Sequence, residues 1–274
     1  MIHEELKITG RRAQRIPVIE NEQSMYATAT IWSKHMTKFF HNREELGGLL
    51  LQPLLWVALF GVGMGALVGS VGGSDYMSFM LPGILALTAL GGAVGGGMSL
   101  LDERLRGILK EYLAAPIPRL SILLGNAAST VTKALLQVAV ILVVGALMGA
   151  QITRNPLGWL ALIVLLTLFT LGFAGIALAF AARSSSIMGY HGLIFLFNLP
   201  LLFASNALYP LASMPGWIKT IALLNPTTYL IDALRATTFG GVATIALPIS
   251  FVVVGLFALL GLALALWSFL RTIL

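Results

Sequence analysis

Residues 155–182 read NPLGWLALIVLLTLFTLGFAGIALAFAA, a run of 28 residues without one charged side chain. An α-helix rises about 1.5 Å per residue, so about 20 apolar residues cross the hydrocarbon core of a bilayer. The run therefore predicts a transmembrane helix. The whole chain of 274 residues agrees, since 58% of it is hydrophobic and 10% is charged, whereas soluble domains carry about a quarter charged residues. A water-soluble enzyme is excluded.

Uncharged stretches long enough for a helix recur along the chain. The others are residues 46–74, 76–101, 134–153, 184–218 and 236–270. Each admits one crossing, which predicts an all-α integral membrane fold with six transmembrane helices. We expect these spans at residues 48–70, 77–101, 121–150, 157–182, 187–208 and 246–270.

The basic residues are distributed unevenly between the two sides of this topology. Six crossings put both termini on one side, where 13 of the 17 Lys and Arg residues fall; three fall on the other side, and Lys133 lies within a span. Cytoplasmic loops carry the excess of Lys and Arg. Both termini are therefore expected in the cytoplasm, and the net charge of +6 indicates membrane orientation and not nucleic-acid binding.

The chain before the first span divides into two parts. Residues 1–24 are polar and predict a mobile cytoplasmic tail. Residues 25–45 predict an amphipathic helix that lies at the membrane interface, because apolar residues recur at spacings of three and four. That stripe consists of Met25, Ala29, Trp32, Met36, Phe39 and Phe40.

The loop between the second and third spans, DERLRGILKEYLAAPIPR (102–119), predicts a short amphipathic helix. Its apolar side chains follow helical spacing, and two prolines end it. The apolar positions are Leu105, Ile108, Leu109, Tyr112 and Leu113. Such a cytoplasmic helix is typical of a docking element for a soluble partner; a helix that only lies on the membrane is the alternative.

The connection between the fifth and sixth spans, residues 208–241, mixes apolar residues with prolines. Non-helical backbone at membrane depth is tolerated where protein or a water-filled cavity covers it. We expect two short re-entrant helices near 214–223 and 226–237 in the outer leaflet, the second capped by Asn225 with Pro226 at its first position. A soluble external hairpin is the alternative.

Two spans carry polar stripes. Asn126, Thr130, Lys133 and Gln137 share one face of the third span, and His191, Asn198 and Ser205 share one face of the fifth. These stripes either line a route across the membrane or hydrogen-bond neighbouring helices. We take Thr130, Lys133, Gln137, His191, Asn198 and Ser205 as the candidate route.

Several functional patterns are absent from the sequence. It has no cysteine, no G-x-x-x-x-G-K-[ST] phosphate loop, and no Asp or Glu within a predicted span. The chain is therefore not expected to be an enzyme, to hold a metal or cofactor, or to bind ATP through such a loop. A transporter driven by an ion or solute gradient is disfavoured, because its usual buried carboxylate is missing.

Two segments resemble those of a known family, the ABC-2-type permeases, which are membrane subunits of bacterial ATP-driven exporters. ERLRGILKEYLAAPIPR (103–119) is similar to that family's E-R-x-x-G-x-L-x-x-L-x-x-x-P-x-x-R segment, and LNPTTYLIDALR (224–235) to its external L-N-P-x-x-Y-x-x-x-x-x-R segment. Leu105 and Ile108 depart from the acidic residue and the Thr that family members often carry. The general pattern looks like permeases of drug, polyketide or lipo-oligosaccharide exporters and of plastid-cyanobacterial relatives.

The resemblance implies a plasma (inner) membrane dimer of two such chains above two separate ABC ATPase subunits, which bind ATP and Mg. Residues 46–274 would form the six-span permease domain. The ATPase-coupling helix would contain Glu103, Arg104, Gly107, Leu109, Glu111, Leu113, Pro116 and Arg119. The external segment would contain Asn225, Pro226, Tyr229, Asp232 and Arg235. The cargo would be amphipathic, drug-like, lipid-linked or a glycan. A stand-alone gradient-driven transporter and a non-transporting assembly factor remain alternatives.

Overall fold

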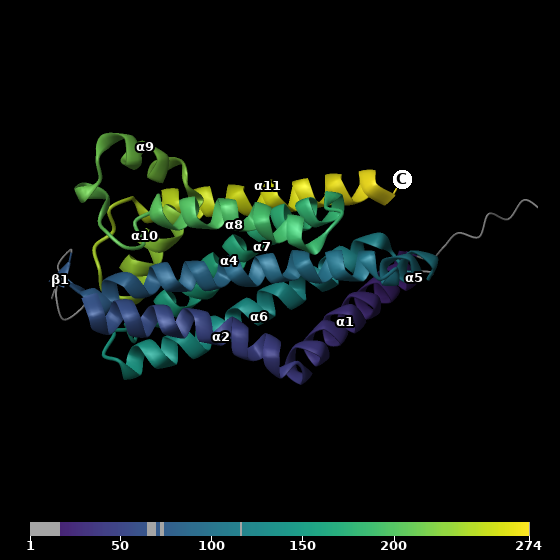
Figure 1. Ribbon diagram of the computed structural model, residues 1–274, viewed down its shortest axis with the longest axis horizontal. Helices are drawn as coiled ribbons and strands as arrows, with labels where there is room; N and C mark the ends of the chain where they lie inside the picture. The colour runs from purple at the N-terminus through teal and green to yellow at the C-terminus, as the bar shows by residue number, and fades with distance from the viewer. Residues whose placement is uncertain (1–16, 65–69, 72–73, 116, 274) are drawn as a thin grey trace, which may run out of the picture.

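The computed structural model describes residues 17–64, 70–71, 74–115 and 117–273, and these are mainly helical (Figure 1). Four long helices form the bundle: α4 (Tyr76–Leu105), α6 (Arg119–Leu147), α7 (Pro156–Arg183) and α11 (Leu247–Ile273). Within the described residues, these four are long and apolar enough to cross a membrane. A 28-residue helix is about 42 Å long, which exceeds the hydrocarbon core of about 30 Å.

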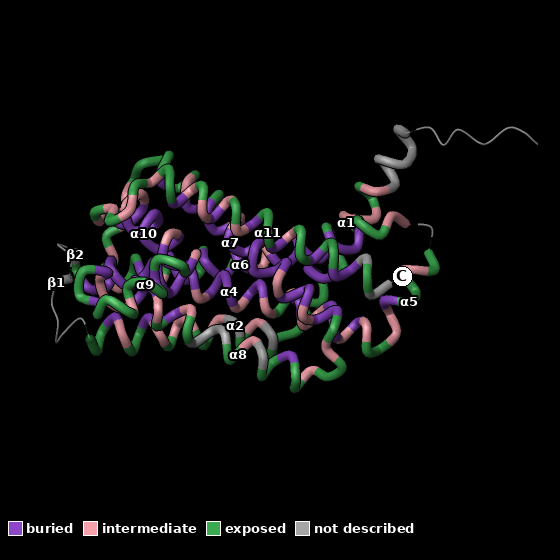
Figure 2. The backbone as a smooth tube through the Cα atoms, turned by 90° about the horizontal axis from the view of Figure 1, so that it is seen from above, coloured by how far each residue is buried: buried purple, intermediate pink, exposed green. Residues whose placement is uncertain are grey.

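The interior of the bundle lies around α4 and α7. Figure 2 shows continuous buried stretches in the middle of the bundle and exposed residues along its outer faces. Helices α7 and α11 approach each other through glycines: a Cβ added to Gly261 would lie 2.1 Å from the carbonyl oxygen of Gly172. Such contact brings the two backbones together and needs small residues.

The N-terminal region forms two helices set at a steep angle. Helix α1 (Pro17–His41) is followed by α2 (Arg43–Trp56) and by a π-helical turn, η1 (Val57–Val62). The two parts, Ser24–His41 and Leu46–Val62, are bent by 81°, and together they count at most as a fifth candidate span. Helix α1 begins at Pro17 and not at Met25, so residues 17–24 are helical; residues 1–16 lie outside the described residues.

The face of α1 that packs against the bundle shares Met36 and Phe39 with the predicted stripe and adds Ile31 and His35. Ile31, His35 and Phe39, one turn apart, are buried, whereas Met25 and Phe40 are 67% and 57% exposed. Helix α1 packs along α6, where a Cβ on Gly125 would lie 2.8 Å from the Cβ of Ile31. The groove that Gly125 opens in α6 therefore decides which face of α1 is buried.

The opposite end of the bundle carries short elements: the hairpin β1 (Ser70–Val71) and β2 (Ser74–Asp75), η2 (Leu211–Ser213), α9 (Gly216–Leu224) and α10 (Pro226–Thr238) (Figure 1). The two short helices expected near 214–223 and 226–237 are present within two residues of those bounds. The side-chain oxygen of Asn225 accepts a hydrogen bond from the amide of Thr227 at 2.9 Å, which confirms the predicted cap.

Helix α8 (Ile187–Phe203) has 17 residues and is shorter than the span expected at 187–208. The chain turns after Phe203. Within the described residues, four helices, or five with the bent α1–α2 pair, satisfy the length and composition of a span. Helices α2 and α8 do not meet that criterion by themselves, so six crossings remain a proposal.

Candidate functional site

The predicted helix at 102–115 is interrupted in the structure. Asp102 to Leu105 form the last turn of α4, the chain turns at Gly107, and α5 (Ile108–Ala114) follows. Gly107 has φ +83°, a left-handed conformation that favours glycine. The interruption leaves Leu105 49% exposed, so this residue does not belong to the apolar face of α5 as predicted. Pro116 lies outside the described residues.

Leu109 anchors α5 in the bundle. Its side chain is 8% exposed and belongs to a buried cluster with one or more residues from each of α1, α4, α6, α7 and α11. The other buried members are Ile31, Leu100, Ile122, Leu123, Leu178, Ala265 and Phe269. Leu113 and Tyr112 pack at its edge. Leu109 therefore belongs to an apolar cluster to which five other helices contribute residues.

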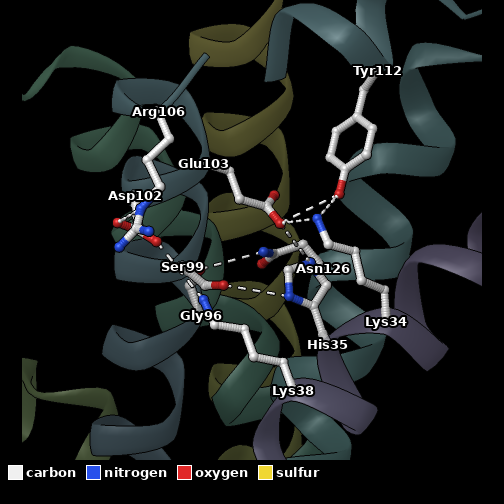
Figure 3. Close-up of polar contacts among 10 residues, drawn as sticks. All are labelled: Lys34, His35, Lys38, Gly96, Ser99, Asp102, Glu103, Arg106, Tyr112 and Asn126. Atoms are coloured by element: carbon white, nitrogen blue, oxygen red, sulfur yellow. Dashed lines mark hydrogen bonds and ion pairs between the residues drawn. The ribbon is translucent and has the colours of Figure 1, made fainter. Parts of the chain in front are cut away.

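Glu103 lies where α1, α4 and α5 meet, as Figure 3 shows. Its carboxylate accepts hydrogen bonds from Lys34 of α1 at 2.8 Å and from the Tyr112 hydroxyl of α5 at 3.3 Å, and Lys34 also contacts the Tyr112 hydroxyl. Glu103 is buried, and a buried carboxylate needs such partners. We call Lys34, Glu103 and Tyr112 the junction cluster.

The charge of the junction cluster is balanced by Lys34 and not by the neighbouring His35. Burial lowers the pKa of Lys34, but hydrogen bonds to Glu103 and Tyr112 outweigh it and hold this pKa above its ordinary value. Burial lowers the pKa of His35, although its Nε2 lies 3.9 Å from Glu103. His35 is therefore neutral near pH 7, and the pair that joins α1 to α4 is Lys34 with Glu103.

Arg104, the next residue, contacts a different helix. Its guanidinium donates to the carbonyl oxygens of Ala181 at 3.3 Å and Ser184 at 3.4 Å, and also to that of Ala182. These carbonyls end α7, where a cation satisfies free acceptors and interacts favourably with the helix dipole. The adjacent Glu103 and Arg104 thus join α4 to two separate helices.

The remaining predicted coupling residues lie on the surface. Glu111 of α5 is exposed beside Lys110, and Arg119 is exposed at the start of α6. Among the described coupling residues, the structure thus separates a buried group (Glu103, Leu109) from an exposed group (Glu111, Arg119). The buried group contacts the bundle, and the exposed group is accessible to another protein.

The structure brings only some residues of the two polar stripes close together. Thr130 is buried and donates to the carbonyl of Asn126 at 2.8 Å. Lys133 of α6 and His191 of α8 line one cavity of about 930 Å³, and Gln137 lines an adjoining cavity of about 360 Å³. Ser205 lies beyond the end of α8 and donates to the carbonyl of Leu202, outside both linings. The side chain of Asn198 lies outside the described residues.

Sequence reasoning missed Lys38 of α1 and Gln52 of α2, which also line these cavities. Periodicity within one helix does not show which other helices border it, so the sequence did not indicate that α1 and α2 lie beside α6 and α8. Within the described residues, no group of three or more His, Asp or Glu side chains could hold a metal ion.

The polar residues of α10 are internal anchors. Arg235 is buried, donates to the carbonyls of Phe79 at 3.1 Å and Asn206 at 2.7 Å, and lies 3.8 Å above the Phe79 ring. Asp232 accepts hydrogen bonds from the amides of Thr244 and Ile245 at 3.0 and 2.8 Å. These contacts join α10 to the start of α4, to the segment after α8 and to the segment before α11.

Tyr229 of α10 contacts the neighbouring short helix: its hydroxyl donates to the carbonyl of Leu223 at 2.7 Å. The side-chain amide of Asn225 donates to the carbonyls of Leu201 and Ala204 at 2.7 and 2.9 Å. Pro226 occupies the first turn of α10, as predicted. Asn225 and Tyr229 thus hold α9, α10 and the end of α8 together.

The bundle and the junction between α4 and α5 define a helical membrane protein with several apolar helices and a partly exposed helix at one end. The family model for ABC-2 type transporters matches residues 26–239. The chain therefore belongs to the ABC-2 type transporter family.

Individual relatives agree with this assignment. Two proteins named transport permease ycf38, from Porphyra purpurea and Cyanophora paradoxa, are 37% and 35% identical over 190 and 192 residues, which is 68% of this chain. The chain spans 65% of the length of each of these relatives. Nodulation protein J of Rhizobium leguminosarum bv. trifolii is 31% identical over 204 residues, 72% of this chain and 74% of that protein.

Proposed function

We propose that this chain is the membrane subunit of an ATP-driven ABC exporter. Two copies form the substrate route, and two separate ABC ATPase subunits, which bind ATP and Mg, dock on α5. The observation that carries this proposal is the arrangement of α5. Leu109 is buried in an apolar cluster to which five other helices contribute residues, while Lys110 and Glu111 are exposed. Family membership supports the same assignment.

The proposed topology has six crossings. Helices α4, α6, α7 and α11 provide four, and the α2–η1 segment and α8 provide two shorter ones, while α1 lies at the interface. The start of α1 and the end of α11 lie at the same end of the bundle (Figure 1), which an even number of crossings requires. Both termini and α5 then face the cytoplasm, in agreement with the Lys and Arg distribution.

The coupling mechanism follows from the contacts of α5. When the ATPase subunits close, they displace α5, and Leu109 and the junction cluster transmit this displacement to α1, α4 and the other helices of the buried cluster. ATP binding must favour one arrangement of the bundle over the other by several kcal/mol to switch it fully. The contacts of Glu103 with Lys34 and with Tyr112 of α5 make that transmission efficient, because they leave α5 little freedom to move alone.

The cargo is proposed to be amphipathic, drug-like, lipid-linked or a glycan. The names of relatives support this range: one is nodulation protein J, and another is the daunorubicin resistance ABC transporter permease protein DrrB1 of Streptomyces coeruleorubidus, 26% identical over 215 residues. The candidate route, Lys133, Gln137 and His191 with the cavities between α4, α6 and α8, mixes polar and apolar linings.

Co-purification tests the proposal. The chain is co-expressed with the genes that neighbour its own and isolated from detergent extracts. We expect an ATPase to co-purify, and the double substitution Lys110→Glu with Glu111→Lys to weaken its retention, because it rearranges the charges on the exposed face of α5. Lys219→Glu on α9, at the other end, is the control and should have no effect.

The absence of any co-purifying ATPase would contradict the exporter assignment. It would leave the stand-alone transporter or the assembly factor as the remaining functions.

A further inference from the structure

Two adjoining cavities lie between α2, α4, α6 and α8. The larger has a volume of about 930 Å³ and the smaller of about 360 Å³. Gln52, Gly91 and Phe195 line both, so the two cavities adjoin along these residues. A side chain added to Gly91 would meet no atom within 4 Å, which places open space beside this glycine.

Basic side chains outnumber acidic ones among the described residues that line the larger cavity. Its lining includes Lys38, Arg106 and Lys133, and Asp102 is the one carboxylate among the described residues that line it. Asp102 is shared, because Arg106 approaches it at 2.7 Å and Lys38 at 3.7 Å (Figure 3). The Lys133 ammonium lies 4.9 Å from the centre of the Phe39 ring. An anionic group would be attracted to these basic side chains.

The smaller cavity is mostly apolar, with one polar group that lacks a partner. Trp56, Leu87 and Leu202 contribute apolar surface. Gln137 lines the same space, is 2% exposed, and its side-chain nitrogen has no hydrogen-bond partner within the described residues. A buried donor without an acceptor is costly, so this amide favours a ligand that carries an oxygen at that depth.

We propose that the two cavities form one binding site for an anionic amphiphile. Its phosphate, sulfate or carboxylate lies near Lys133 and Arg106, its apolar part lies beside Trp56, and an oxygen between them accepts a hydrogen bond from Gln137. This inference rests on the proposed exporter function and deepens it, because it names the chemical class of the cargo. An anionic membrane lipid shares this chemistry.

The test uses the full chain in phosphatidylcholine nanodiscs and a dodecyl phosphate with bromine on its chain, which quenches tryptophan fluorescence on contact. The part of the quenching that is lost in Trp56→Phe reports the site itself. We expect the phosphate to bind at least about tenfold more tightly than a brominated dodecyl maltoside, and Lys133→Gln to weaken phosphate binding roughly tenfold. Lys110→Gln, which removes an exposed charge outside the cavities, is the matched control.

Arg106→Gln provides a second variant whose folding is not in question, because that side chain is 69% exposed; it should weaken phosphate binding in the same direction. Equal affinity for phosphate and maltoside, or equal losses in Lys133→Gln and Lys110→Gln, would overturn the inference. Adding phosphatidylglycerol distinguishes the sources: competition identifies a membrane lipid as the occupant, and its absence identifies another anionic amphiphile, and both results support the site.

Failure of this inference is distinguishable from failure of the exporter function. The binding assay needs no ATPase, so a chain that retains its ATPase but does not prefer the phosphate contradicts this inference alone. A chain that binds the phosphate as expected but never co-purifies with an ATPase contradicts the exporter function and leaves the anion site in place.

Discussion

Replacing Glu103 by glutamine removes the charge that α1 and α5 share at the end of α4. The glutamine keeps the shape and one acceptor, but it loses the ion pair with Lys34 at 2.8 Å. We expect the ATPase subunits to remain bound, because the exposed face of α5 is unchanged. We also expect the permease to stimulate ATP hydrolysis less, because α5 is held less firmly against α1.

The magnitude follows from the exposure of the two partners. The Glu103 side chain is 6% exposed and that of Lys34 is 43% exposed, so Lys34 can turn toward water when its partner is lost. The cost therefore lies between that of an exposed pair, below about 1 kcal/mol, and that of a broken buried pair, about 3–5 kcal/mol. We expect about 1–2 kcal/mol, which corresponds to a roughly 5- to 30-fold loss of stimulation.

The assay measures ATP hydrolysis by the ATPase subunit with and without each permease variant in proteoliposomes. Lys34→Met and the double variant complete a mutant cycle, in which the two effects should not add, because both remove the same pair. Glu44→Gln, the same chemical change at an exposed position of α2, is the control. Wild-type stimulation by Glu103→Gln, or fully additive effects in the cycle, would refute the role of the junction cluster.

Three further predictions concern stability and its pH dependence. Arg235→Ala should destabilise the protein by about 3–5 kcal/mol, because it removes charged hydrogen bonds and a cation–π contact from a buried site. The measurement is the thermal midpoint in detergent, which should fall, and Lys219→Ala is the control. Gly261→Val should destabilise the protein by about 1–3 kcal/mol or more and so lower that midpoint. Gly255→Val on the same helix, where a Cβ meets nothing within 4 Å, should not lower it. Burial lowers the pKa of His35 below 6.5, so the stability that neutral His35 contributes is present above pH 6.5 and is lost as the pH falls through the lowered pKa. Wild type should therefore lose more stability than His35→Asn between neutral pH and about pH 5. Equal losses in the two proteins would contradict the reasoning.

The long helices were predictable because charge is so rare in this chain. The uncharged stretches contain most of α4, α7 and α11 and the second half of α6, and apolar composition and length decide whether a helix can span a bilayer. The cap at Asn225 and the proline after it also placed α10 within one residue, because capping depends on local chemistry. These features require no knowledge of the tertiary contacts.

The errors arose where tertiary contacts decide. Periodicity placed Met25, Met36, Phe39 and Phe40 in one stripe, but it did not indicate Ile31, which packs at the groove of Gly125. The loop 102–115 was predicted as one helix, yet Gly107 interrupts it and leaves Leu105 outside the apolar face. No single helix reveals which of its faces another helix covers, so these details required the structure.

Distance along the chain also hid the candidate site. Lys34 and Glu103 are 69 residues apart, and the pairing that joins them depends on how α1 lies against α4 and α6. Glu103 and Arg104 were predicted within the ATPase-coupling helix, and the structure places both side chains against other helices of the bundle. The ATPase contact that we propose therefore uses the exposed residues of α5.

Site-specific photo-crosslinking in intact membranes tests the central claim, that an ATPase docks on α5. A photoreactive amino acid is placed at Glu111, or at Lys219 on α9 as the control. The cells also express the ATPase subunits that co-purify with the chain. The account predicts a crosslink to the ATPase from position 111 and none from position 219. A crosslink from position 219 alone, or none from position 111 in an active complex, would contradict it.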